Sequence, residues 1–366
     1  MEPNNLVHRA RERYIKNKEK RESNVIDYIP FFYSLPRFSQ YMPGLVGGNY
    51  YHITANTSVG KTALAKYMTI LIPYIFSKVV SPLKYKVIYF ALEESEEEFI
   101  DNLNCTILNE VYGLNVDPLM LNSFREKTVS EDIIKKLIAV EKVVEDIMSK
   151  VELQTNILNP TGIYKHCRSI SEEMGTHVYK KESFTSNPVY SHYLPNDDTQ
   201  VLVVIDNFNL LMPENGASTL REAMTKMSFD YCRLQITKNW KWTVVGVVQQ
   251  AAAGEQEEFY RGRSIISKLK PSLYNYGDNK VISRDAHIVL GLFGPDRFEL
   301  DDYVGYDIKQ FRSTLKSLEI LKNRLGRVNV EIPLFFDHTL GTFSELPRPD
   351  DTTLLSNFYK KVEKIL

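Results

Sequence analysis

The sequence predicts an α/β protein in which helices cover both faces of a mostly parallel central sheet, with a C-terminal antiparallel extension. Short apolar runs, typical of strands buried on both faces, alternate along the chain with longer segments of helical periodicity. Between the first of these strands and a long apolar helix lies a turn of small residues ending in Gly-Lys-Thr, a pattern typical of phosphate-binding loops. With 43% apolar residues among 366, the chain can build the large core that this fold needs.

The chain is predicted to consist of an N-terminal arm, a main domain and a C-terminal tail. Residues 1–32 are predicted as a basic helical arm or linker, because apolar residues recur there at helical spacing among Arg and Lys. This segment fits either a solvated terminal helix or an arm that docks on a neighbouring subunit. Residues 33–350 form the predicted α/β domain, and residues 351–366 a C-terminal helix or tail.

Strands and helices are predicted to alternate within the main domain. Strands are expected at residues 50–54, 86–92, 201–205, 243–248, 286–293 and 315–321. Helices are expected at residues 62–79 and 220–239 and over most of residues 95–175. Residues 328–336 and 341–343 suggest a closing hairpin. Residues 176–199 show no period and are predicted as a loop or insertion.

Charge and cysteine content exclude several classes of protein. The formal net charge of −1 shows that the chain is not a polycation, so any contact with nucleic acid would need a local basic surface. The cysteines Cys105, Cys167 and Cys232 have no CxxC spacing and are expected to be reduced core thiols. No apolar run reaches the roughly 18 residues of a membrane span. We therefore expect a cytoplasmic protein with no membrane partner.

The turn at positions 55–62 reads A-x-x-x-x-G-K-T, which differs from the usual phosphate-binding motif only in its first residue. Gly60 would let the backbone approach a phosphate, and the following helix would point its N–H groups at the anion. Lys61 would reach the β- and γ-phosphates of a nucleotide, and the Thr62 hydroxyl would bind Mg²⁺. The predicted nucleotide-binding residues are Ala55, Asn56, Thr57, Ser58, Val59, Gly60, Lys61 and Thr62.

Two carboxylates are predicted to lie near this loop, because each follows a buried apolar strand. Asp206 ends the run at residues 201–205, and the carboxyl ends of parallel strands meet where open α/β sheets bind their ligands. There it would hold Mg²⁺ through water. Glu93 follows the run at residues 86–92, in a place that suits a carboxylate acting on an attacking water. Glu94 is the local alternative.

Taken together, several stretches resemble the C-terminal ATPase domain of DnaB-family replicative helicases, which is a RecA-like P-loop NTPase core. They are residues 43–49 (PGLVGGN), 90–95 (FALEES), 203–212 (VVIDNFNLLM), 244–249 (VVGVVQ) and 320–326 (ILKNRLG). The family often has Ala at the position of Ala55. The similarity covers roughly residues 33–346 and lacks a counterpart of the family's N-terminal helical domain. A pared-down helicase of this kind would suit a phage, and would then act in the host cytoplasm.

The resemblance implies roles for individual residues. Glu93 becomes the catalytic carboxylate, and Gln249 the sensor of the γ-phosphate, with Gln250 as the alternative. Lys322 and Arg324 would act in trans, in the site of the neighbouring subunit, with Arg327 as the alternative to Arg324. Residues 251–270 take the place of a DNA-facing loop. Its candidate DNA-binding residues are Arg261, Arg263, Lys268 and Lys270.

The expected function is that of an ATP-dependent replicative DNA helicase that needs Mg²⁺. It would be a homo-hexameric ring that translocates on single-stranded DNA and unwinds duplex, with a primase or a helicase loader as further partners. Two alternatives stay open. One is a RecA-like recombinase that forms filaments, and the other is a KaiC-like regulatory ATPase without a nucleic-acid substrate.

Overall fold

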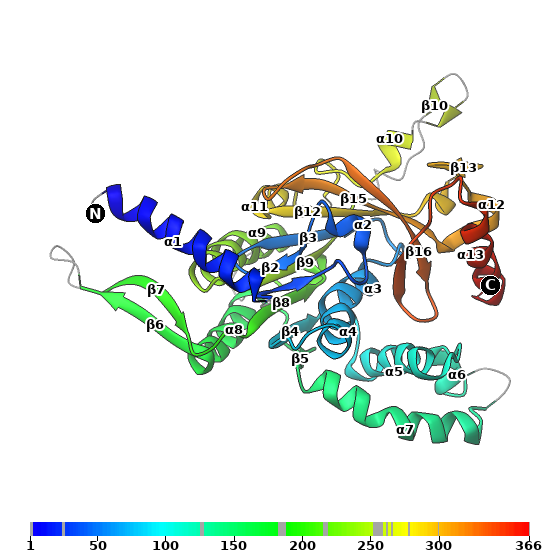
Figure 1. Ribbon diagram of the computed structural model, residues 1–366, viewed down its shortest axis with the longest axis horizontal. Coiled ribbons are helices and arrows are strands. Elements are labelled where there is room, and N and C mark those ends of the chain that lie inside the picture. Colours follow the sequence, from blue (N-terminus) through cyan, green and yellow to red (C-terminus); the bar gives the residue numbers. More distant parts are fainter. Residues whose placement is uncertain are drawn as a thin grey trace.

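The computed structural model describes residues 3–23, 26–124, 128–181, 188–214, 219–251, 259–260, 263–264, 266–276, 279–298 and 300–365. Within these residues the centre of the molecule is a nine-stranded sheet with the order β17-β16-β15-β12-β3-β9-β8-β4-β5 (Figure 1). The six strands from β12 to β5 are parallel, whereas β15, β16 and β17 continue the sheet antiparallel. The predicted α/β fold with a C-terminal antiparallel extension is therefore confirmed.

The strand bounds follow the predicted apolar runs closely. The strands are β3 (Tyr50–Ala55), β4 (Tyr85–Ala91), β5 (Val151–Gln154), β8 (Gln200–Asp206), β9 (Thr243–Gln249), β12 (Ile288–Phe293), β15 (Leu315–Asn323), β16 (Val330–Asp337) and β17 (Thr342–Glu345). All six parallel strands begin at one edge of the sheet, here called the amino edge, and end at the opposite carboxyl edge. The phosphate-binding loop, residues 55–62, follows β3 at the carboxyl edge.

Helices cover both faces of the sheet, each over its own apolar core. The first face carries α3 (Lys61–Lys66), the π-helical segment η1 (Tyr67–Leu71), α4 (Ile72–Val79), α5 (Glu96–Tyr112) and α7 (Glu131–Met148). The second carries α8 (Pro160–Met174), α9 (Leu220–Thr225), the π-helical segment η3 (Lys226–Asn239) and α11 (Ile282–Asp285). Alternate residues of β3 point to opposite faces, so Tyr51 joins the first core and Tyr50 the second. This two-sided burial explains the continuous apolar runs of the sequence.

The C-terminal residues add a third, smaller core beside the antiparallel strands. It packs α12 (Ile308–Phe311) and α13 (Thr352–Ile365) against β16 through residues such as Phe311, Phe335, Leu355 and Val362. Helix α1 (Pro3–Glu22) lies at the other end of the chain and extends away from the sheet (Figure 1). The domain boundaries predicted from the sequence stay a prediction. Among the described residues, no helix is long and apolar enough to cross a membrane.

Two segments differ from the sequence-based expectation. Residues 176–199 contain not only a loop but also an antiparallel hairpin, β6 (Gly175–Lys180) and β7 (Val189–Pro195). Its alternation is hidden in the sequence because aromatic and His residues occupy the packed face. Residues 95–175 are helical as expected except for β5, which adds an edge strand beside β4. A strand this short gives almost no periodic signal, and its pairing with β4 decides its structure.

Candidate nucleotide-binding site

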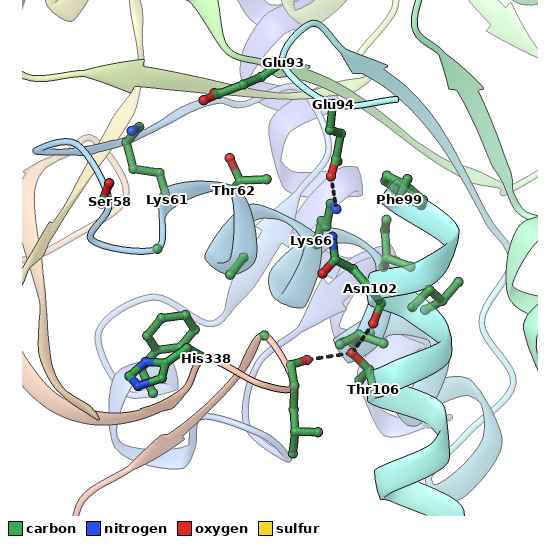
Figure 2. A pocket seen from close by; sticks show the side chains of 18 of the residues that line it. Ser58, Lys61, Thr62, Lys66, Glu93, Glu94, Phe99, Asn102, Thr106 and His338 are labelled. Carbon is green, nitrogen blue, oxygen red and sulfur yellow. Dashed lines mark hydrogen bonds and ion pairs between the residues drawn. The ribbon is translucent and has the colours of Figure 1, made fainter. Parts of the chain in front are cut away.

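The phosphate-binding loop has the backbone that a close approach to an anion requires. Gly60, the residue before α3, has a φ of 107°, and Ser58 has a φ of 58°. A Cβ at Gly60 would also lie 3.0 Å from the ring of Phe336, so both conformation and space demand glycine there. Lys61 is 8% exposed at the start of α3, while Thr57 and Ser58 are exposed at the turn. The loop residues therefore line an opening at the carboxyl edge (Figure 2).

The two predicted Mg²⁺ ligands lie next to each other. Thr62 Oγ1 donates a hydrogen bond to Asp206 Oδ1 at 3.2 Å, and the Tyr89 hydroxyl donates to Asp206 Oδ2 at 2.8 Å. Asp206 is 2% exposed at the end of β8. A carboxylate and a hydroxyl oxygen are hard donors of the type that Mg²⁺ prefers, so this pair could hold the ion directly or through water.

Burial sets the electrostatics of this corner. It raises the pKa of Asp206 to about 6, although the hydrogen bonds from Tyr89 and Thr62 favour the ionised form. Burial also lowers the pKa of Lys61, and the carboxylates of Glu93 and Asp206 oppose that shift. A cation or a phosphate chain brought to the site would relieve the cost of these buried charges.

We expect Asp206→Asn to stabilise the metal-free protein near pH 8, by up to about 3 kcal/mol. The folded-state pKa, about 6, lies above the ordinary 3.8, so ionising this carboxyl costs free energy in the folded state. That cost is absent below about pH 4, grows as the pH rises, and is complete above about pH 6. The Thr62 and Tyr89 hydroxyls can turn to accept from the amide. Thermal melts in EDTA measure the effect. A gain in melting temperature that persists at pH 4 contradicts it.

Glu93 and Glu94 have different surroundings although they are adjacent. Glu93 is exposed at the site and accepts a hydrogen bond from Asn207 Nδ2 at 2.9 Å. Glu94 forms an ion pair with Lys66 at 2.6 Å, and burial raises the pKa of Glu94 while Lys66 opposes the rise. Figure 2 shows the pair pointing towards each other, with Glu93 on the side of the phosphate-binding loop. The structure therefore leaves Glu93 available to act on a water and engages Glu94 with a lysine.

Gln249 and Gln250 also separate clearly. Strand β9 lies between β3 and β8, so its terminal Gln249 reaches the phosphate-binding loop, where Nε2 donates to Thr57 Oγ1 at 2.7 Å. Its backbone N–H donates to Asn209 Oδ1 at 2.9 Å. Gln250 is buried and donates to Thr54 Oγ1 at 2.7 Å. The geometry thus favours Gln249 as the residue that would meet a γ-phosphate.

The pocket at this edge also contains residues that the sequence motifs did not indicate. Its volume is about 440 Å³, and it extends from the loop to α5 and to the β16–β17 hairpin. Its apolar side is lined by Ile70, Leu71, Phe99, Leu103 and Leu340. Arg297, which lies in the short helix η5 (Pro295–Arg297) after β12, donates a hydrogen bond to the Thr57 carbonyl. Long-range packing brings these residues together, and no local pattern signals it.

The structure does not bring Arg324 and Lys322 to the phosphate-binding loop of their own chain. Antiparallel β15 ends at the amino edge, where Asn323 pairs with Ile288, and Ile288 in turn pairs with Tyr51 near the start of β3. Arg324 is exposed just beyond it, so the loop after Ala55 lies roughly 15 Å further along the strands. Lys322 Nζ donates to the carbonyls of Ser283 and Arg284 at the end of α11. Arg327 lies in the same exposed turn as Arg324.

The predicted DNA-facing loop is described only in part. Arg261 lies outside the described residues. Arg263 belongs to the short strand β11 (Arg263–Ser264), but its side chain also lies outside them. Lys268 is exposed on α10 (Ile266–Leu269), whereas Lys270 forms an ion pair with Glu331 at 2.7 Å. A DNA-binding role for these four residues stays a prediction.

Comparison with known proteins places this fold among RecA-like ATPases. No family model and no curated protein matches the sequence. The structure is similar to the ATPase domain of a DnaB-like helicase, with a TM-score of 0.65, 18% identity and coverage of 92% of this chain and 98% of the other. It is also similar to a DnaB-like replicative helicase studied for its interactions with primase (TM-score 0.60, 18% identity, 86% of this chain and 63% of that one). A KaiC-like protein from Pyrococcus horikoshii OT3 gives a TM-score of 0.45 at 12% identity, over 87% and 99% of the two chains. The likenesses to the two DnaB-like helicases confirm the RecA-like fold implied by the sequence resemblance.

Proposed function

We propose that this protein is an ATP-driven DNA helicase whose hydrolytic site is shared between neighbouring copies in a ring. The observation that carries the proposal is the division of the site residues between two edges of one sheet. Lys61, Thr62, Glu93, Asp206 and Gln249 gather at the carboxyl edge. Arg324 and Lys322 lie at the amino edge, out of reach of their own loop. A head-to-tail contact between copies would bring the two sets together.

Each residue has a chemical task in such a site. Lys61 and the N–H groups at the start of α3 would bind the β- and γ-phosphates of ATP. Thr62 and Asp206 would hold Mg²⁺, which neutralises phosphate charge when bound. Glu93, positioned by the Asn207 amide, would orient the attacking water and take its proton. Arg324 of the next copy would stabilise charge on the transferred phosphoryl group. The apolar side of the pocket would receive the nucleoside.

The link from hydrolysis to DNA is proposed through Gln249. Its amide hydrogen bonds to Thr57 in this structure, and a γ-phosphate would offer it a competing acceptor. Gln249 also comes immediately before residues 251–270, so a shift at its side chain would be felt at the base of that loop. Basic side chains there would bind the phosphates of single-stranded DNA without sequence preference, and binding should weaken with salt. A primase or loader is proposed as a further partner by likeness to the helicase family.

ATP hydrolysis and strand separation test the proposal directly. Single-stranded DNA is expected to stimulate hydrolysis several-fold, and the protein with ATP and Mg²⁺ is expected to unwind a forked duplex. Lys61→Ala is the control for contaminating activity in both assays. Efficient strand exchange without unwinding would instead indicate a recombinase. Hydrolysis that is insensitive to DNA would indicate a regulatory ATPase.

A further inference from the structure

The β6–β7 hairpin is anchored to the body of the protein by an aromatic face. The register places His177 opposite Tyr193 and Tyr179 opposite Tyr190, so these four side chains share one face. The His177 ring lies 5.0 Å from the Tyr193 ring and 5.6 Å from the ring of Trp240, which follows η3. The Tyr190 hydroxyl donates to the Asn239 carbonyl at 3.1 Å. The base of the hairpin is therefore fixed by packing.

The opposite face of the hairpin is aliphatic and uncovered. It is formed by the pairs Thr176–Leu194, Val178–His192 and Lys180–Val189. Leu194 is 58% exposed and Val189 is 40% exposed. The outward face of a hairpin is ordinarily polar, and a two-stranded sheet gains little stability alone. An aliphatic outward face on a firmly anchored hairpin indicates a protein contact.

The hairpin leaves the molecule at the edge that carries Arg324. Strand β7 leads into β8, which begins at the amino edge, and antiparallel β15 ends at that same edge. Helix α1 also precedes the strands that begin there. Figure 1 shows α1 and the hairpin projecting on the same side of the sheet, beside α11.

The two edges of the sheet complement each other. Exposed cations at the amino edge are Lys180, Lys181, Arg324 and Arg327. Exposed carboxylates at the carboxyl edge are Glu93, Glu96, Glu97 and Glu98. After β8, the carboxyl edge also exposes Leu210 (42%) and Met212 (54%), which offer an apolar surface. The uncovered face of the hairpin is aliphatic and not aromatic, so stacking on nucleic-acid bases explains it less well.

We propose that Val178, Val189 and Leu194 of the hairpin pack on the carboxyl edge of a second copy of this chain. The hairpin would then hold the neighbour in the orientation that brings Arg324 to the neighbour's phosphate-binding loop. The inference rests on the proposed function in one respect, because both require head-to-tail assembly. It adds a contact that is separate from the residues acting on ATP.

The test compares Val189→Glu/Leu194→Glu with the matched control Leu354→Glu, which changes a 51% exposed leucine on α13. Sedimentation velocity over a concentration series, with Mg²⁺ and a non-hydrolysable ATP analogue, measures assembly. The hairpin variant is expected to need roughly tenfold or more protein for half-assembly, because aliphatic burial is lost and charge is introduced. The control should assemble like the wild-type protein. Both changes are at exposed positions, so the melting temperature of the monomer should stay the same.

Two outcomes separate this inference from the proposed function. If the wild-type chain assembles and the hairpin variant assembles at the same concentrations, the hairpin contact is wrong while the shared site stands. If the wild-type chain stays monomeric under every condition, the shared site itself fails. Anisotropy with labelled oligo(dT) covers the alternative partner. Loss of DNA binding with unchanged assembly would make the hairpin a DNA contact and overturn the inference.

Discussion

Replacing Arg324 by alanine is expected to lower steady-state ATP hydrolysis by roughly 10³- to 10⁵-fold, as removal of an arginine finger does. Arg324 lies at the amino edge and cannot reach the loop of its own chain, so its guanidinium can serve only a neighbouring site. Binding of ATP should persist, because Lys61, Thr62 and Asp206 are intact at the carboxyl edge. A phosphate-release assay and equilibrium binding of a fluorescent ATP analogue measure the two effects separately.

Mixing two inactive variants makes this prediction specific to a shared site. Arg324→Ala protein has a complete carboxyl edge, and Lys61→Ala protein has an intact Arg324. Together they should recover part of the activity, because some interfaces join the two intact halves. Arg327→Ala serves as the control, since Arg327 lies in the same exposed turn and should have a much smaller effect. Mixtures that regain no hydrolysis although the subunits exchange would argue against a site completed in trans.

The parts of the site that the sequence predicts are those that follow directly from a strand. Asp206 and Gln249 end buried apolar runs, and Glu93 comes two residues after the last residue of β4. In a parallel sheet covered on both faces, such positions meet at one edge whatever the details of the connections. The phosphate-binding loop adds a second local signal, because its glycine is required by φ and by the Phe336 ring. Local pattern and topology together are sufficient for these residues.

The remaining features depend on contacts between distant segments. Arg297 meets Thr57 only because η5 folds over the loop from beyond β12. Gln250 is set apart from Gln249 by burial against Thr54, which no spacing rule shows. The β6–β7 hairpin was predicted as a loop because its anchoring face consists of Tyr and His residues, whose polar atoms mask the alternation. Long-range packing therefore decides what local periodicity leaves open.

Replacing Glu93 by glutamine is expected to reduce kcat by about 10²- to 10⁴-fold while ATP binding stays close to that of the wild-type protein. Glutamine has nearly the shape of glutamate, and its carbonyl can still accept the hydrogen bond from Asn207 Nδ2. What is lost is the ability to take a proton from the attacking water. Single-turnover hydrolysis with prebound ATP isolates this step from binding and release.

Glu94→Gln is the matched control, because it makes the same chemical change one residue further along. Glu94 is paired with Lys66 beneath the ring of Phe99, so the variant should lose an ion pair and lower the melting temperature. Its single-turnover rate should stay within a few-fold of the wild-type rate, since this carboxylate is directed at a lysine. The reverse result, with Glu94→Gln inactive and Glu93→Gln active, would transfer the catalytic role to Glu94. The Lys66–Glu94 pair would then have to open on nucleotide binding.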